Sequence, residues 1–141
     1  MLLHKSYGIA NLELSVPMPS DGIFFIASVT KQFIAAALLK LVEAKKLSLD
    51  DDFTKYLEFD TKGRKISIAQ LLDHTFGLAQ AGSKEEFMQM TFDEFPQTLM
   101  VQLVEPKDFL HEPGEALTYN NTVFVFLGLI VEKVTGESYE D

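Results

Sequence analysis

Residues 28–46, which read SVTKQFIAAALLKLVEAKK, are rich in Ala, Leu and Lys and contain neither Pro nor Gly. Such residues lose little conformational freedom on becoming helical, so the stretch predicts a helix of roughly four or five turns. Its middle part, residues 33–39, is apolar on nearly every side, which predicts burial all round. At 141 residues the chain is long enough to fold as one domain around a substantial core.

Turn and capping residues predict the other elements. Alternating apolar residues broken by glycine and asparagine indicate a short hairpin or edge strand. Three capping boxes, in which an N-cap side chain and a side chain three residues later bond each other's backbone N–H groups, indicate helix starts. A glycine directly after an apolar run indicates a helix end. The predicted segments are a hairpin at 5–16, a short helical piece near 46–57, helices near 67–74, 83–90, 92–104 and 122–135, and a turn-rich loop at 105–121.

Charge and composition exclude several classes of function. The net charge of −9 argues against nucleic acid or an anionic membrane as a partner, because proteins that bind them gather Lys and Arg on one face. The most apolar run, Val123–Val131, is too short to span a bilayer, and no signal peptide is visible, so the compartment stays open. Without cysteine there is no thiolate ligand or nucleophile, and Asp50–Asp52 do not fit a calcium loop, so neither a metal nor a cofactor is expected.

Ser28 and Lys31 stand three residues apart at the start of the predicted helix, where positions i and i+3 share a face. A serine hydroxyl becomes a good nucleophile when a neighbour takes its proton, and a neutral lysine amine can do so. Burial beside the apolar residues 24–26 would favour the neutral amine, and backbone N–H groups at the helix start could stabilise an oxyanion. The plainer interpretation is a helix-capping serine and a lysine reaching to solvent.

Tyr119 and Asn121 form a second pair, just before the last predicted helix. In an extended segment, residues two apart point to the same side, so the phenol and the carboxamide could face one cleft. A phenolate near a lysine can transfer protons, and an asparagine can hold a substrate amide or orient the lysine. The plainer interpretation makes Asn121 an N-cap and Tyr119 a half-buried aromatic residue.

The order S-x-x-K, about ninety residues of mostly helical chain, then Y-x-N, resembles the serine β-lactamase and penicillin-binding-protein superfamily, in its class C β-lactamase, DD-peptidase and esterase branch. The segments YGIANLE, FFIASVTKQFIAAALLKLVEAKKLSLDD, ISIAQLLDHTFGL and PGEALTYNNTVFVFLGLIVEKVTGESY are similar to family segments and span almost the whole chain. The resemblance implies that Ser28 is acylated, Lys31 accepts its proton, Tyr119 is a general acid or base, and Asn121 orients substrate and lysine.

The resemblance also implies an α+β fold of the β-lactamase/transpeptidase-like type. Residues 1–141 would form a single incomplete domain, with N-terminal strands in 1–27 and a helical subdomain in 28–141, and with the helix that carries Ser28 as the most buried helix. The family's third motif, Lys or His, then Thr or Ser, then Gly on a later strand, is absent, and so are the C-terminal strands of the sheet. Where relatives commonly have His-Thr-Ser-Gly-Leu, this chain has Phe76 in place of the serine, which we expect to be a structural change. His74 in the same segment is expected to be a packed or helix-end residue and not a base.

Two functions remain open at this point. The first is acyl-enzyme hydrolysis of an amide or ester by Ser28, with a β-lactam, a D-alanyl peptide of the peptidoglycan kind or a small ester as substrate. The second is a catalytically silent fragment that self-associates or is completed by another chain through the apolar face left by the missing sheet.

Overall fold

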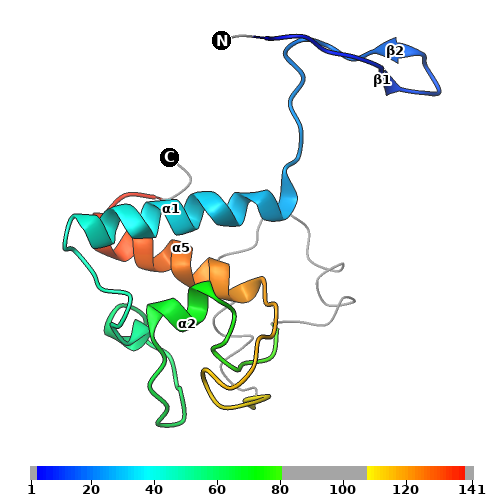
Figure 1. Cartoon of the computed structure of the whole chain (residues 1–141). Coiled ribbons are helices and arrows are strands. Elements are labelled where there is room, and N and C mark those ends of the chain that lie inside the picture. The colour runs from blue at the N-terminus through cyan, green and yellow to red at the C-terminus, as the bar shows by residue number, and fades with distance from the viewer. Residues whose placement is uncertain (1–2, 81–107, 139–141) are drawn as a thin grey trace. The chain divides into compact units, whose positions relative to one another are not determined.

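The computed structural model describes residues 3–80 and 108–138, which belong to two compact units, Met1–Thr30 and Lys31–Asp141 (Figure 1). The helices predicted near 83–90 and 92–104 lie outside the described residues. The assignment of the chain as a single incomplete domain stays a prediction.

The N-terminal unit contains a two-stranded antiparallel hairpin, β1 (Ile9–Asn11) and β2 (Val16–Pro17). The Asn11 side chain accepts the N–H of Leu14 at 2.7 Å, which closes the connecting turn. The hairpin predicted at 5–16 is therefore confirmed.

Helix α1 (Thr30–Glu43) follows directly on a 3₁₀ turn, η1 (Ala27–Val29). The helix predicted over 28–46 is confirmed in its middle and is shorter at both ends. At its C-terminal end Lys45 takes a left-handed backbone conformation, with φ of 57°, and its N–H bonds to the carbonyl of Val42 at 2.9 Å. This is the geometry of a Schellman ending, which stops the helix without a glycine.

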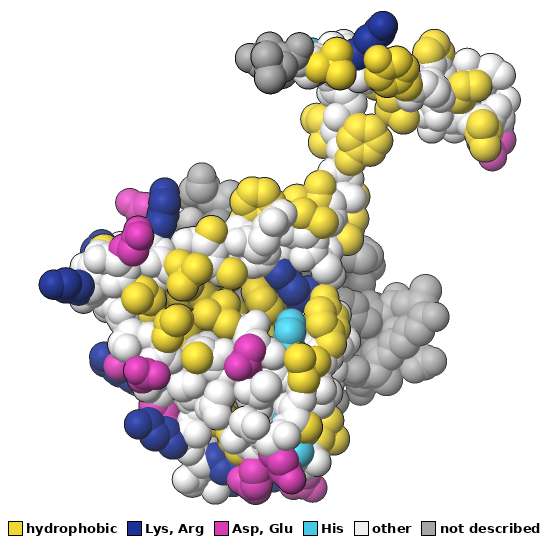
Figure 2. Space-filling model, in the orientation of Figure 1, with side chains coloured by type: hydrophobic (Ala, Val, Ile, Leu, Met, Phe, Trp, Pro, Cys, Tyr) yellow, Lys and Arg dark blue, Asp and Glu magenta, His cyan; other side chains and the backbone are white. Residues whose placement is uncertain are grey.

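The expectation that residues 33–39 are buried all round is wrong. Leu38 is fully buried, but Phe33 is 60% exposed and Leu39 is 48% exposed. Hydrophobic side chains on this unit are visible at the surface in Figure 2. Within the described residues of its own unit, 31–80 and 108–138, α1 packs one side against the core and leaves Phe33 and Leu39 exposed on the other.

Helix α2 (Ile68–Leu72) starts with the predicted capping box. The Ser67 hydroxyl accepts the N–H of Gln70 at 3.2 Å, and the Gln70 side chain accepts the N–H of Ser67 at 2.9 Å. The helix ends before residue 74 because His74 has a left-handed backbone, with φ of 63°.

Helix α5 (Thr122–Thr135) ends at Gly136, whose φ of 79° suits a glycine cap, so the predicted last helix is confirmed. Among the described helices it is α5, and not the α1 expected from sequence, that is most buried, with eight buried residues. The reason is that α5 contacts α2 and contributes most of its length to the core cluster that α1 joins from one side (Figure 1).

The centre of this core is a trio of aromatic rings. Phe53 lies in a short 3₁₀ turn, η2 (Phe53–Lys55), which confirms the predicted helical piece. Its ring contacts those of Phe59 and Phe126, and the three ring centroids lie 5.4 to 5.9 Å apart. Such pairs add about 0.5–1.5 kcal/mol each beyond the area they bury. The start of α5 is therefore anchored firmly against the rest of its unit. No helix within residues 3–80 and 108–138 is long and apolar enough to cross a membrane.

Candidate functional site

Ser28 lies in η1, two residues ahead of the first residue of α1. Its predecessor Ala27 has φ of 46°, in the left-handed region that residues with a Cβ rarely adopt. Strain of this kind costs about 1–3 kcal/mol and is often found at functional sites. The N–H of Val29 is already bonded to the carbonyl of Ile26 at 3.1 Å, so the expected oxyanion donors do not include this group.

Phe24, Phe25 and Ile26, which are expected from sequence to bury the lysine, belong to the N-terminal unit and lie in a stretch without regular structure between the hairpin and η1. Lys31 belongs to the other unit. Burial of Lys31 by these residues therefore stays a prediction.

Lys31 and Asn121 are in direct contact. The Lys31 Nζ donates a hydrogen bond of 2.7 Å to Asn121 Oδ1 across ninety residues of sequence. Asn121 occupies the N-cap position of α5, but its side chain makes no capping bond. The bond to the first turn comes instead from Asn120, whose Oδ1 accepts the N–H of Thr122 at 2.8 Å. Asn121 is therefore the N-cap by position, as the plainer interpretation expects, but its side chain bonds the lysine and does not cap the helix.

The ring of Tyr119 lies close to the same ammonium group, with its centroid 5.0 Å from Lys31 Nζ. The ring of Phe124, in the first turn of α5, lies 5.5 Å from it. Each such cation–π contact is worth about 0.5–1 kcal/mol at an exposed site. Tyr119 is 50% exposed, so its ring combines a packed face with access to solvent. Tyr119 and Asn121 thus contact one lysine, as expected if both face one cleft.

His74 is a site residue whose contacts could not be expected from sequence. Its ring centroid lies 4.7 Å from that of Tyr119 and 5.4 Å from that of Phe124. Its Nδ1 accepts the N–H of Asn120 at 3.3 Å. Burial lowers the pKa of His74 below its ordinary 6.5, the charge of Lys31 lowers it further, and Asp73 raises it. The expectation of a packed residue at a helix end is confirmed.

Asn120 is a second residue that sequence reasoning missed. It is fully buried, and its side chain donates to the carbonyl of Leu78 at 3.1 Å while accepting the N–H of Thr122. A buried amide satisfied on both sides rigidifies its surroundings. Asn120 therefore fixes the backbone between Tyr119 and Asn121. The only signal in the sequence is a polar residue beside an apolar helix, which does not distinguish a buried residue from an exposed one.

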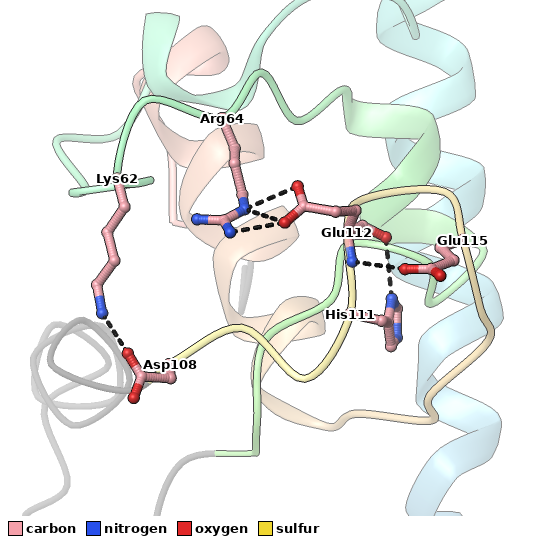
Figure 3. A network of polar contacts seen from close by, with 6 residues as sticks. All are labelled: Lys62, Arg64, Asp108, His111, Glu112 and Glu115. Carbon is pink, nitrogen blue, oxygen red and sulfur yellow. Dashed lines mark hydrogen bonds and ion pairs between the residues drawn. The ribbon is translucent and has the colours of Figure 1, made fainter.

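The loop before Tyr119 is held by polar contacts, which Figure 3 shows. The Arg64 guanidinium bonds both carboxylate oxygens of Glu112, at distances of 2.7 to 3.2 Å, and lowers the pKa of that carboxyl. Lys62 bonds Asp108 at 2.7 Å. The His111 Nδ1 lies 3.0 Å from the carbonyl of Glu112. The contacts of Arg64 and Lys62 tie the start of the loop to the turn at 61–65.

Segment 74–78 runs beside the same loop. Gly77 accepts the N–H of Leu110 at 2.7 Å, and a Cβ at Gly77 would lie 2.3 Å from the carbonyl oxygen of His111. Only glycine permits this approach, since its φ is also 94°. Phe76, at the position where relatives commonly have serine, is 1% exposed and lies in the core. The phenylalanine that stands here in place of serine therefore adds an apolar side chain to the core.

No group of three or more potential ligands among His, Cys, Asp and Glu that could hold a metal ion occurs within the described residues. The arrangement offers instead a lysine, a phenol and a carboxamide in contact, with Ser28 three residues before the lysine in sequence. The lysine and the phenol are groups that can move a proton to and from a hydroxyl, and the carboxamide can orient the lysine.

Comparison with known proteins identifies relatives of the chain. It is 30% identical over 150 residues to penicillin-binding protein 4* of Bacillus subtilis (strain 168), in an alignment that covers 100% of this chain and 32% of that protein. The crystal structure of a penicillin-binding protein from Bacillus halodurans has a TM-score of 0.76 and 32% identity, covering 95% of this chain and 41% of that one. The D-amino acid amidase from Ochrobactrum anthropi SV3, complexed with L-phenylalanine, has a TM-score of 0.80 and 28% identity, covering 94% and 36%.

The chain spans 28% to 32% of the length of the curated relatives it matches. Its structural neighbours include hydrolases, which supports hydrolase chemistry at the level of the family. They also identify the fold as the β-lactamase/transpeptidase-like α+β type. The sequence profile of the family described as Beta-lactamase matches residues 1–141, and the chain belongs to that family.

Proposed function

We propose that the chain carries the nucleophile side of a serine hydrolase site that works through an acyl-enzyme, with Ser28 as the nucleophile. The observation that supports this most is the position of Lys31 Nζ, 2.7 Å from Asn121 Oδ1 and 5.0 Å from the ring centroid of Tyr119. Three residues that the family resemblance assigns to one reaction are thus in contact in the folded chain. A lysine that only reached to solvent would not need these partners.

In the acylation step the Ser28 Oγ forms a bond to the carbonyl carbon of an amide or ester. The hydroxyl proton passes to the Lys31 amine or to the Tyr119 phenolate. The C–N or C–O bond of the substrate then breaks, and the leaving amine or alcohol takes up that proton. A water molecule next attacks the ester on Ser28 and gives its proton to the same base, which returns it to the departing Ser28 oxygen.

Asn121 has two roles in this proposal. Its Oδ1 holds the end of Lys31 in place, and its amide N–H groups are donors that can bond the carbonyl of a bound substrate. A fixed lysine loses less freedom when the reaction begins, which is how positioning lowers a barrier.

The proposed substrates are acyl donors of three kinds: a β-lactam, a D-alanyl peptide or a small ester. The names of the penicillin-binding relatives favour a β-lactam, and that of the D-amino acid amidase favours an amide next to a D-centre. Specificity in such a site depends on loops and on parts of the relatives that the chain does not span, so the residues described do not choose among them.

Labelling with covalent probes tests the proposal. The chain is incubated with a fluorescent penicillin and with a fluorophosphonate, and intact mass is compared with that of a Ser28→Ala variant. The proposal expects one adduct per chain that disappears in the variant. An unmodified chain with both probes, or an adduct that persists in Ser28→Ala, would contradict it.

A second candidate function is favoured by the exposed apolar side of α1. Phe33 and Leu39 are exposed there, and such residues often mark contact surfaces. In this alternative the chain is silent alone and self-associates or is completed by another chain. Sedimentation across a range of concentrations tests it: a compact monomer that unfolds cooperatively would contradict this candidate.

A further inference from the structure

The backbone of His74 adopts a conformation that is usually left to glycine. His74 follows the C-cap of α2, its φ is 63°, and the N–H groups of His74 and Thr75 bond back to the carbonyls of Leu71 and Gln70 at 3.4 and 3.0 Å. This is a Schellman ending, and glycine is the common residue at its left-handed position, as Gly136 is at the end of α5. A histidine with this backbone conformation lowers the stability of the folded chain.

The histidine bonds both residues that flank Tyr119. The carbonyl of His74 accepts the N–H of Thr118 at 2.9 Å, and the imidazole Nδ1 accepts the N–H of Asn120 at 3.3 Å. The imidazole ring also lies against the phenol ring, with 4.7 Å between centroids. The backbone on each side of Tyr119 and the face of its ring are thus held by one residue.

The bond to Asn120 defines which form of the imidazole is present. A backbone N–H can only donate, so Nδ1 of His74 must be unprotonated and the proton of the neutral ring lies on Nε2. His111 provides a contrast within the same chain. Its Nδ1 faces the carbonyl of Glu112, which can only accept, so there Nδ1 carries the proton. The two histidines are therefore expected to be opposite tautomers.

The surroundings favour the neutral ring of His74. Burial is the first cause that lowers the pKa of His74 below 6.5, and the positive charge of Lys31, from α1, is the second. The carboxylate of Asp73, in the same turn, acts in the opposite direction, and the phenol of Tyr119 faces the ring from the segment before α5.

We propose that His74 is a positioning residue: as a neutral imidazole it fixes the Tyr119 ring against Lys31. Its effect on the reaction rests on the function proposed for Ser28, Lys31 and Tyr119. Protonation of His74 would replace the acceptor at Nδ1 by a donor, break the bond to Asn120 and place a second positive charge near Lys31. Acylation is then expected to fall on the acidic side as His74 titrates.

Nuclear magnetic resonance on the whole chain tests the positioning without relying on catalysis. The ¹⁵N shifts are expected to show an unprotonated Nδ1 in His74 and a protonated Nδ1 in His111. The amide of Asn120 is expected to titrate together with the His74 ring, with a midpoint below 6.5. A protonated Nδ1 in His74 at neutral pH, or an Asn120 amide that does not respond, would overturn the proposal.

Two substitutions separate the acceptor from the backbone conformation, because Asn and Gly both tolerate a left-handed φ. His74→Asn places an amide oxygen near the position of Nδ1, whereas His74→Gly has no acceptor. We expect nuclear Overhauser contacts between the Tyr119 ring and the Lys31 side chain to persist in His74→Asn and to vanish in His74→Gly. Contacts that persist equally in both variants would overturn the proposal.

Acylation of Ser28 by a fluorophosphonate gives the second measurement. His74→Gly is expected to slow it by about 10- to 100-fold, as a misplaced catalytic group does. His74→Asn is expected to retain most of the wild-type acylation rate and to lack the decrease in that rate at acidic pH. Equal rates and equal pH profiles in the three proteins would overturn the proposal. If the wild-type chain is not acylated at all, the proposed function fails, and the resonance experiments still decide the role of His74.

Discussion

Lys31 Nζ and Asn121 Oδ1 lie 2.7 Å apart, joining the first turn of α1 to the residue before α5. The bond connects two motifs separated by ninety residues, and it is made by the side chain of an N-cap residue that does not cap its helix. The side chain of the neighbouring residue, Asn120, caps the helix instead. The two adjacent asparagines thus have different roles: Asn120 stabilises the fold, and Asn121 binds the lysine at the candidate site.

The two asparagines are expected to respond differently to the same substitution. Asn120→Ala removes a fully buried amide and leaves the Leu78 carbonyl and the Thr122 N–H without it, so we expect a loss of about 2 kcal/mol in the free energy of unfolding. Asn121→Ala loses an exposed contact and is expected to change that free energy by less than about 1 kcal/mol while slowing acylation of Ser28. Urea unfolding and the labelling rate measure the two effects. An equal loss in the free energy of unfolding in both variants would contradict these separate roles of Asn120 and Asn121.

A second matched pair tests the packing of α1 and α5. Phe126 is fully buried among aromatic rings, whereas Phe33 is 60% exposed. We expect Phe126→Ala to cost about 3–5 kcal/mol, because the cavity cannot collapse fully. Phe33→Ala is expected to stay within about 0.5 kcal/mol. Chemical denaturation of both variants decides this, and a large loss in Phe33→Ala would mean that α1 is covered on that side.

Two glycines with positive φ are expected to differ in their tolerance of a methyl group. At Gly63 a Cβ would meet nothing within 4 Å, so Gly63→Ala costs only the left-handed strain, about 1 kcal/mol. At Gly77 it would meet the His111 carbonyl at 2.3 Å, so Gly77→Ala is expected to cost at least about 2 kcal/mol more. Thermal unfolding compares the two. Similar costs would show that the loop at 109–118 does not lie against Gly77.

Stability on the acidic side is expected to depend on Asp51. The Tyr56 hydroxyl, the Ser48 N–H and the Lys55 ammonium bond its carboxylate and lower its pKa from 3.8 to about 2. Because the folded-state pKa is the lower one, the contribution is complete above 3.8 and is lost as the pH falls towards 2. Asp51→Asn should therefore lose less stability than the wild type over that range. Asp50→Asn, which removes a neighbouring carboxylate outside this network, serves as the control and should follow the wild type.

The motifs could be predicted from sequence because they depend on local spacing. The capping box at Ser67 and the glycine end at Gly136 involve neighbours only, and both are confirmed. The spacing of Tyr119 and Asn121 indicates only that both can face one side, whereas their contact with Lys31, ninety residues away, is implied by the family resemblance.

The burial of α1 could not be predicted, because apolar composition does not reveal which sides of a helix are covered. The contacts of His74 could not be predicted for a different reason. A left-handed helix end favours glycine in sequence, so a histidine gives no sign that α2 ends there or that its ring contacts Tyr119. Long-range partners of this kind are set by the tertiary fold.

The rate at which a fluorophosphonate modifies Ser28, with the site mapped by peptide mass, decides whether Ser28 is a nucleophile activated by Lys31. We expect a single adduct on Ser28 in the wild-type chain, none in Ser28→Ala, and a rate lower by about 10³-fold or more in Lys31→Met, as expected for groups that act as a unit. Modification at another residue, or an equal rate in Lys31→Met, would contradict it.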